Sequence, residues 1–295
     1  MQMNKLYKDL YLKFEKEGYN IADKKSKGIY KQQKKDREEL LNKIARVILT
    51  YTVIEEVLSV GDKDKKTLTK EFNSIINSIV TGEYKTEKEI TKNILSTVAK
   101  DKYYKDAYTL NLGIDFNLKK LTDKQLKNIV NEKIKGEVWS NRLWKNKKQL
   151  EKQLKKEINN LINGKTTINK IEKNIKTKFN KNAYNTKRLV DNEVTRVQNS
   201  VNNVFAEEHG IEKQMFMATL DNRTTDICRS LDGKIFDIND NNKPSIPADT
   251  HVGCRSCLIN MPSSDYKPKL RKNNITKEYV PFQTYDEWAE QQDID

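Results

Sequence analysis

The chain has 295 residues and a formal net charge of +14, from 56 Lys and Arg against 42 Asp and Glu. Its mean hydropathy is −0.87, but 36% of the residues are hydrophobic and they recur periodically, which argues against a disordered chain. The longest apolar run, residues 45–60, is interrupted by Arg46, Glu55 and Glu56, which excludes a helix that spans a bilayer. The first nine residues lack the apolar core of a signal peptide, so we expect synthesis in a reducing cytoplasm and no membrane contact.

Residues 1–110 are predicted to form an N-terminal helical region. Apolar residues there recur at the spacing of helix faces, and Thr86 with Glu89 has the spacing of a capping box at a helix start. The predicted helices cover residues 4–20, 36–60, 67–80 and 86–100, with a polar connector at 23–33. We interpret their apolar faces as the core of a helical bundle, and a groove for a partner as the alternative.

Residues 122–210 are predicted to form a basic helical segment. Thr122 and Gln125 form a second capping-box pattern, and Leu150, Leu154, Ile158 and Ile162 form an apolar stripe that stops at an Asn-Gly pair. A further helix is expected to follow it. Valines at 190, 194, 197, 201 and 204 then form the seam of a helix that ends at His209 and Gly210.

The excess positive charge of the chain is concentrated in this basic segment. Between residues 137 and 188 there are fifteen Lys and Arg against four Glu, which supplies +11 of the net +14. Such a surface either contacts phosphates without reading bases or is a solvated face that acidic N-terminal helices balance. The candidate nucleic-acid-binding residues are Lys145, Lys147, Lys148, Lys152, Lys155, Lys156, Lys170, Lys173 and Lys176.

Residues 211–262 are predicted to form a small module of strands. Short apolar segments at 213–220, 234–236 and 255–261 have the length and alternation of strands, and Asp232 with Gly233 forms a turn signal before the second. The expected fold class is therefore α+β, with predominantly α-helical N-terminal and middle regions and a small C-terminal antiparallel sheet. Residues 263–295 are expected to be a C-terminal arm with an aromatic and acidic end, which folds back or docks on another subunit.

All three cysteines of the chain and one of its two histidines fall within the strand module. His251, Cys254 and Cys257 follow one another as H-x-x-C-x-x-C, and Cys228 precedes them. Thiolates and imidazole are the ligands that Zn²⁺ prefers, and four of them would close a tetrahedral, structural site. The alternative is a set of buried free thiols beside a hydrogen-bond network of Asp221, Arg223 and His251.

Motifs of the C-terminal half resemble one known family. The motifs are D-x-R-T at 221–224, C-x-x-L-D-G at 228–233, P-x-x-x-H-x-x-C-R-S at 247–256, G-x-x-W-S-x-R-x-W at 136–144, R-L-V-x-x-E at 188–193 and T-Y-D-E-W at 284–288. Together they are similar to the phage head morphogenesis proteins, the Mu F-like minor head or minor capsid proteins. The positions that the resemblance singles out are Glu193, Asp221, Arg223, Gly233 and Arg255.

The resemblance implies a minor capsid protein of a tailed phage or prophage. Such a protein would lie inside the head of the virion, assemble in the host cytoplasm, associate with the portal and other capsid or scaffold proteins, and contact phage DNA non-specifically. A zinc-stapled nucleic-acid-binding protein outside the virion is the first alternative. A prophage-borne toxin or hydrolase is the second. Because the Cys/His segment carries no Gly-rich phosphate loop, G-x-S-x-G, H-E-x-x-H or E-x-E, we expect no enzymatic activity.

Overall fold

The protein is mostly helical with small antiparallel sheets, so the predicted α+β class is confirmed. A computed structural model describes residues 3–111, 118–261 and 270–291. Its helices are α1 (Met3–Thr50), α2 (Asp62–Asn111), α3 (Asp123–Asn131), α4 (Trp139–Ile162), α5 (Ile168–Glu208), α6 (Asp226–Leu231) and α7 (Tyr285–Glu290). Its strands are β1 (Thr52–Ile54), β2 (Val57–Ser59), β3 (Lys213–Met217), β4 (Ile235–Asp237), β5 (Cys257–Asn260), β6 (Leu270–Lys272) and β7 (Tyr279–Pro281). None of the helices in the described ranges is long and apolar enough to cross a membrane.

Three helices are longer than the sequence predicts. The expected connector at 23–33 lies inside α1, the expected start at Thr86 lies inside α2, and α5 unites the helix after α4 with the valine seam. The buried face of α1 continues through the expected connector by way of Ser26, Ile29 and Gln33. Polar residues on this face interrupt the apolar pattern without interrupting the helix, because no proline or strong helix-breaking cluster stands there.

Contacts between Cα atoms divide the chain into two compact units. Unit 1 comprises Met1–Ala22, Ile94–Lys135 and Asp191–Asp295, and unit 2 comprises Asp23–Asn93 and Gly136–Val190. The regions predicted from the sequence, at 1–110, 122–210, 211–262 and 263–295, are continuous stretches of chain, whereas each compact unit combines several stretches. The predicted boundaries therefore stay predictions.

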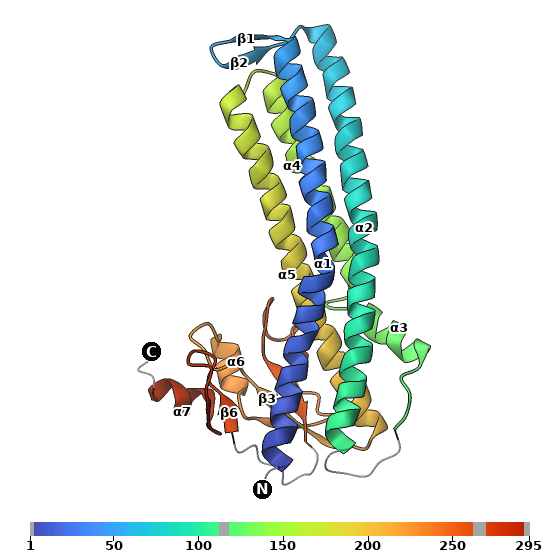
Figure 1. Ribbon diagram of the computed structural model, residues 1–295, viewed down its shortest axis with the longest axis vertical. Coiled ribbons are helices and arrows are strands. Elements are labelled where there is room, and N and C mark those ends of the chain that lie inside the picture. The colour runs from blue at the N-terminus through green and yellow to red at the C-terminus, as the bar shows by residue number, and fades with distance from the viewer. Residues whose placement is uncertain (1–2, 112–117, 262–269, 292–295) are drawn as a thin grey trace. The chain divides into compact units, whose positions relative to one another are not determined.

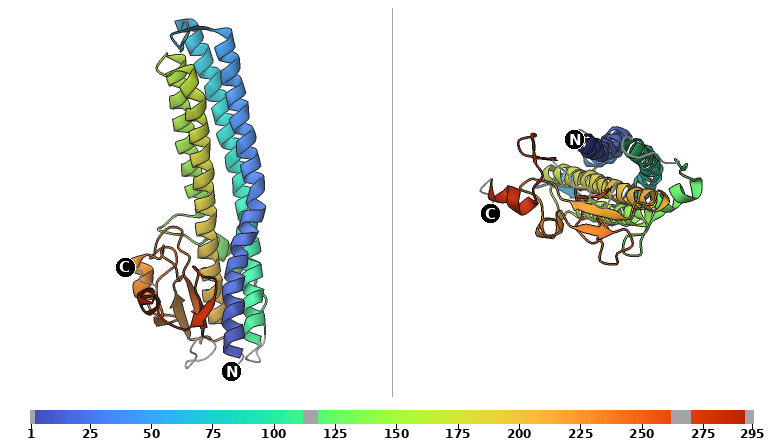
Figure 2. Two further views of the ribbon diagram at one scale, coloured as in Figure 1. Left: turned by 60° about the vertical axis from the view of Figure 1, so that its left-hand side comes forward. Right: turned by 90° about the horizontal axis from the view of Figure 1, so that it is seen from below.

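Unit 2 is a four-helix bundle. Segments of α1, α2, α4 and α5 run side by side (Figures 1 and 2), and each contributes one apolar stripe to a shared core. The stripe predicted on α4 is confirmed, since Leu150, Leu154, Ile158 and Ile162 are all buried. Burial of such stripes is the main stabilising contribution to a bundle, at roughly 1.5–3 kcal/mol for each large apolar side chain.

A two-stranded hairpin replaces the predicted end of the first long helix. The helix ends at Thr50 rather than at residue 60, and β1 pairs antiparallel with β2. The sequence from 50 to 54 is Thr-Tyr-Thr-Val-Ile, a run of β-branched and aromatic residues that favours a strand. The turn residues Glu55 and Glu56 both have positive φ, 48° and 63°.

Unit 1 contains the three-stranded antiparallel sheet β4-β3-β5. The three predicted strands are confirmed, with Met215 opposite Ile235 in β4 and Ile259 in β5. The sheet lies against the C-terminal part of α5 (Figure 2). The Asn202 side chain of α5 donates to the Leu258 carbonyl of β5 at 2.9 Å. The predicted capping box of α3 is also confirmed, with Thr122 and Gln125 bonding each other reciprocally.

The described part of the C-terminal arm folds back onto unit 1. The hairpin β6–β7 and helix α7 pack against the module, and Trp288 and Tyr285 are buried there. The main-chain amide of Asn274 donates to the Leu220 carbonyl at 3.0 Å, and the Tyr285 hydroxyl donates to the Asp221 carbonyl at 3.0 Å. Of the two expectations for the arm, folding back is the one that the structure shows.

Candidate metal centre and lysine-rich surface

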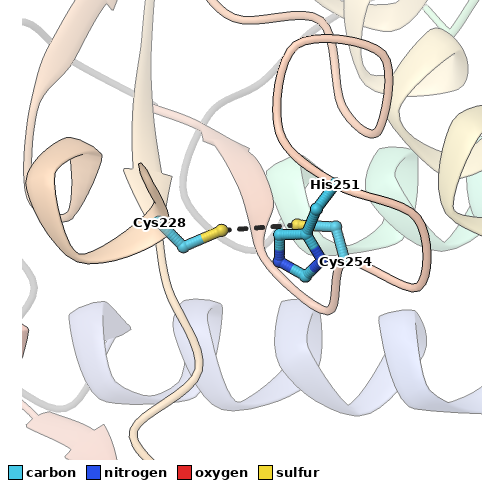
Figure 3. A group of neighbouring side chains, drawn as sticks. All are labelled: Cys228, His251 and Cys254. Carbon is cyan, nitrogen blue, oxygen red and sulfur yellow. Dashed lines mark hydrogen bonds between the residues drawn. The ribbon is translucent and has the colours of Figure 1, made fainter. Parts of the chain in front are cut away.

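Three of the four predicted metal ligands lie together. Cys228 on α6 meets His251 and Cys254 from the loop before β5, and their ligand atoms all lie within 4.8 Å of one another. The sulfurs of Cys228 and Cys254 are 3.6 Å apart, and the imidazole of His251 stands beside them (Figure 3). Both cysteines are buried and His251 is partly exposed, so the cluster lies just below the surface.

The loop that carries His251 and Cys254 is held in place by backbone bonds. The amide of Cys254 donates to the His251 carbonyl at 3.1 Å, across a turn in which Gly253 has a φ of 78°. Helix α5 fixes the loop from the other side. The Gly253 amide donates to the Asn192 side chain at 3.1 Å, and the Thr195 hydroxyl donates to the Cys254 carbonyl at 3.3 Å.

The two cysteines of the cluster differ in acidity. The Cys228 thiol, with contributions from Thr250 and Ser256, lowers the pKa of Cys254 below its ordinary value. The hydrogen bond to Cys254, together with burial, raises the pKa of Cys228. One sulfur is therefore ready to be a thiolate, which is the form that binds a metal.

The prediction that Cys257 is the fourth ligand is wrong. Cys257 is the first residue of β5, and its side chain packs with Met215, Met217, Ile259 and Met261. Cys228 and Cys254 belong to a different cluster, with Phe216 and Leu258. Successive side chains of a strand point to opposite faces, so the Cys257 cluster and the cluster of Cys228 and Cys254 lie on opposite faces of the sheet. The described cluster offers three ligand atoms. A tetrahedral zinc ion bound there would therefore have a fourth coordination position for water or another ligand.

The principal partner of Asp221 is Arg255 rather than Arg223. Arg255 binds both carboxylate oxygens of Asp221, with Nη2 at 2.9 Å from Oδ1. The guanidinium of Arg223 is 3.7 Å away and 75% exposed, although the Arg223 amide donates to the carboxylate at 2.9 Å. Burial opposes ionisation, but Arg255 and the amide hold the pKa of Asp221 below its ordinary value. The alternative prediction, a hydrogen-bond network of Asp221, Arg223 and His251, does not include His251 among the described hydrogen bonds. The His251 ring contacts the Val252 carbonyl instead.

Gly233 forms the predicted turn. Its neighbour Asp232 also forms buried hydrogen bonds that the sequence does not indicate. Gly233 has a φ of 74° and donates to the Phe216 carbonyl at 2.9 Å. The carboxylate of Asp232 accepts the amides of Ala218 and Tyr285, each at 2.7 Å, and both ends of the Arg271 guanidinium. Asp232 thereby ties together β3, β6 and α7. The C-x-x-L-D-G motif contains this residue, but its turn propensity alone does not indicate these bonds.

Glu193 is buried in unit 1 and holds Arg196, with a distance of 2.7 Å between Oε2 and Nε. Arg196 donates to the carbonyls of Ile129 and Val130 at 2.6 and 2.9 Å, which are among the last carbonyls of α3. The pair therefore caps the C-terminus of α3, whose final carbonyls lack partners within the helix.

The predicted lysine surface lies on α4 and α5 of unit 2. Lys145, Lys148, Lys152, Lys156, Lys170, Lys173 and Lys176 are exposed, and Lys155 is half-buried. Glu137, Glu151 and Glu172 pair with some of these lysines. Lys152, Lys156, Lys170 and Lys173 form no ion pair within the described residues. A shallow groove of about 570 Å³ runs along α4 between Lys148 and Asn160.

Lys147 does not belong to this surface, so the prediction is wrong for this residue. Its side chain is fully buried, and its Nζ lies 2.6 Å from Glu83 and also contacts Glu87. A signal for this was present in the sequence. Lys147 continues the stripe of Leu143, Leu150 and Leu154 at steps of four, three and four, which places it on the buried face of α4.

Residues 147–259 match the family described as Phage Mu protein F like protein, so the chain carries a Mu F-like domain that contains Cys228, His251 and Cys254. The resemblance noted from the motifs is confirmed for this segment.

One similar protein is the NAD(+)–arginine ADP-ribosyltransferase EFV of Enterococcus faecalis (strain ATCC 700802 / V583), which is 27% identical over 308 residues. The match covers 97% of this chain and 60% of that protein, so the chain spans somewhat less than two thirds of its relative's length. No solved structure matches the chain.

Proposed function

We propose that the chain is a minor capsid protein that acts in the morphogenesis of a phage or prophage head. The observation that carries the proposal is the Mu F-like domain at residues 147–259. Capsid components, with the portal and scaffold among them, are the expected partners, and the inside of the head is the expected location. The test is to co-express the chain with portal and scaffold proteins and to image the assembled heads. Absence of the chain from purified heads would overturn the proposal and favour a nucleic-acid-binding protein outside the virion.

We further propose that the exposed lysines of α4 and α5 contact the phosphates of packaged DNA. Lys152, Lys156, Lys170 and Lys173 support this, because they are exposed and no carboxylate within the described ranges neutralises them. Binding by counterion release is steeply dependent on salt and indifferent to sequence.

The DNA proposal is tested by changing these four lysines to Glu and measuring affinity for random duplex DNA against salt. The salt slope should fall by about one for each lysine that no longer binds a phosphate. A matched control changes four exposed lysines of α2, Lys63, Lys66, Lys70 and Lys85, to Glu, which alters the net charge equally. Equal reductions of affinity in both variants would show that net charge alone, and not this surface, attracts DNA.

The metal centre supports a further proposal, that Cys228, His251 and Cys254 hold a Zn²⁺ ion. Two sulfurs and an imidazole within 4.8 Å of one another are the donors that zinc prefers. The ion would brace α6 against the loop before β5. Purified protein should contain one zinc for each chain by elemental analysis, and Cys254→Ser should lose it. Cys257→Ser is the matched control and should retain the metal, because Cys257 lies on the other face of the sheet.

Enzymatic activity is the second candidate function, and the transferase relative is the observation that favours it. We propose that this chain lacks that activity, because 40% of the relative falls outside the match. Incubation with labelled NAD and an arginine-rich acceptor protein is the test. Transfer of label that depends on this chain would establish an enzyme.

A further inference from the structure

A cleft of about 800 Å³ opens in unit 1, on residues distinct from the lysine surface of α4 and α5. It is lined by the N-terminal part of α1, by Asp191 and Thr195 of α5, by the end of β3, by the loop 253–257 and by the hairpin β6–β7 with its connecting turn. A volume of this size accepts a ligand as large as a few amino-acid residues.

The rim of the cleft is cationic. Lys13 and Lys16 project from α1, and Lys272 and Lys277 come from the hairpin β6–β7 and its turn. Within the described residues, none of the four forms an ion pair with a carboxylate. They differ in this from Arg255 and Arg271, which also line the cleft but are bound by Asp221 and Asp232.

The carboxylates that line the cleft do not balance these four lysines. They are Glu15 and Asp191, and Glu15 lies 3.2 Å from Lys102, outside the cleft. The lining therefore retains an excess of positive charge, and close like charges that face one cavity are stabilised when an anionic ligand enters.

Part of the lining of the cleft is apolar. Leu10, Met217, Ala218 and Tyr279 line it, and the Tyr279 side chain is exposed. A lining that combines lysines without carboxylate partners and apolar side chains matches a ligand that carries both carboxylates and apolar side chains. A phosphate alone would leave the apolar side chains of the lining without contacts, and a DNA duplex presents a continuous rod of charge that does not enter so small a volume.

We propose that this cleft binds an acidic, partly apolar segment of a partner polypeptide in an extended conformation. The carboxylates of the segment pair with Lys13 and Lys16 of α1 and with Lys272 and Lys277 of the hairpin β6–β7 and its turn. Its apolar side chains pack on Met217 and Tyr279. This interaction is separate from DNA binding, because the two surfaces lie on different units and share no residue.

The test uses the full chain and a fluorescein-labelled hexapeptide of alternating glutamate and leucine, followed by fluorescence anisotropy. The peptide should bind in low salt, and Lys13→Glu with Lys16→Glu should weaken binding at least tenfold, as should Lys272→Glu with Lys277→Glu. Tyr279→Ala should weaken it without changing the charge. A matched control, Lys152→Glu with Lys156→Glu, should leave peptide affinity within about twofold, because it makes the same change of charge on unit 2.

Three further measurements decide between this and other ligands. A hexapeptide of alternating lysine and leucine should not bind, and inorganic pyrophosphate should not displace the acidic peptide at equal concentration. Single-stranded DNA should not compete for the cleft. Equal affinity for the basic peptide, no effect of either lysine pair, or displacement by pyrophosphate or DNA would each overturn the proposal. Unchanged circular dichroism of the lysine variants excludes unfolding as the cause of any weakening.

Discussion

Lys147 shows how one side chain within a basic segment can serve the core rather than the surface. It neutralises Glu83 and Glu87 from α2 and contacts Asn182 of α5 at 3.0 Å, so one ammonium group links three helices of unit 2. Gln33 of α1 donates to Glu87 at 2.6 Å and joins the same network. Polar networks of this kind fix the relative register of helices, since a shift of one helix would leave buried charges without partners.

Replacement of Lys147 by Met should lower the free energy of unfolding by about 3–5 kcal/mol, because two carboxylates would stay buried without a cation. Lys148→Met is the matched control, because Lys148 is the adjacent residue and is exposed, and its described contacts are an ion pair with Glu151 and a cation–π contact with Trp144. The control should change stability by less than about 0.5 kcal/mol. Urea denaturation of the three proteins measures both values. Similar stabilities for the two variants would contradict the structural role assigned to Lys147.

The same network predicts a pH dependence. Burial and the neighbouring Glu87 raise the pKa of Glu83, and this outweighs the lowering by Lys147 and Asn182. A carboxyl group whose pKa is raised by folding contributes stability that is fully present below its unfolded pKa, about 4.5, and lost as pH rises through the folded value. Glu83→Gln should remove this component. The free energy of unfolding of the variant, measured in urea from pH 4.5 to 8, should therefore fall less with rising pH than that of the natural chain, and parallel curves would refute the assignment.

At the scale of elements, the hairpin β1–β2 contains a strained turn. Two-residue hairpin loops of this kind require positive φ at both central positions, which Asn-Gly satisfies without strain. Glu55 and Glu56 occupy these positions instead. Such conformations cost non-glycine residues about 1 kcal/mol or more each.

Substitution of Glu55 by Asn together with Glu56 by Gly should raise the free energy of unfolding by about 1–2 kcal/mol. The control, Glu55→Gln with Glu56→Gln, removes the same two charges and keeps the strain, so it should change stability little. Thermal and urea denaturation measure the difference. If the glutamine variant gained as much, charge repulsion rather than backbone conformation would be the cause.

Elements with a strong local pattern could be predicted from the sequence. The stripe of α4, the capping box of Thr122 and the three strands of the sheet each rest on residues close together in the chain, and all are confirmed. The predicted break in α1 at residues 23–33 was wrong, because Ser26 and Gln33 lie on its buried face. Polar residues at buried positions interrupt the apolar periodicity from which helices are predicted. The hairpin β1–β2 was missed because its apolar residues also fit a helix face.

The candidate site was predictable in composition but not in geometry. Cys228, His251 and Cys254 could be grouped by residue type, whereas the direction of Cys257 depends on where β5 begins. The bond between Asp221 and Arg255 joins residues 34 positions apart, so only the tertiary fold selects Arg255 over the nearer Arg223.

At the scale of the whole molecule, the two units should respond differently to removal of a metal. All three donors of the candidate centre lie in unit 1, and the core of unit 2 contains none of them. Treatment with a strong chelator should therefore accelerate amide hydrogen exchange in α6 and in residues 250–256, and leave α4 unchanged.

Mutants provide the controls for this measurement. Cys254→Ser should reproduce the exchange pattern of the chelated protein without chelator, and Cys257→Ser should respond as the natural chain does. Acceleration spread evenly over both units would indicate general destabilisation and would contradict a local brace.

The buried carboxylate of Asp232 has a consequence for how the chain tolerates shortening. Two of its four contacts come from the guanidinium of Arg271 and one from the amide of Tyr285, which both follow the sheet in sequence. A protease that cut between β5 and β6 and released the remainder would leave this carboxylate with the Ala218 amide alone of its four described contacts. The sheet and the segment after it therefore form one cooperative piece, and a fragment that stops at residue 260 would not persist on its own.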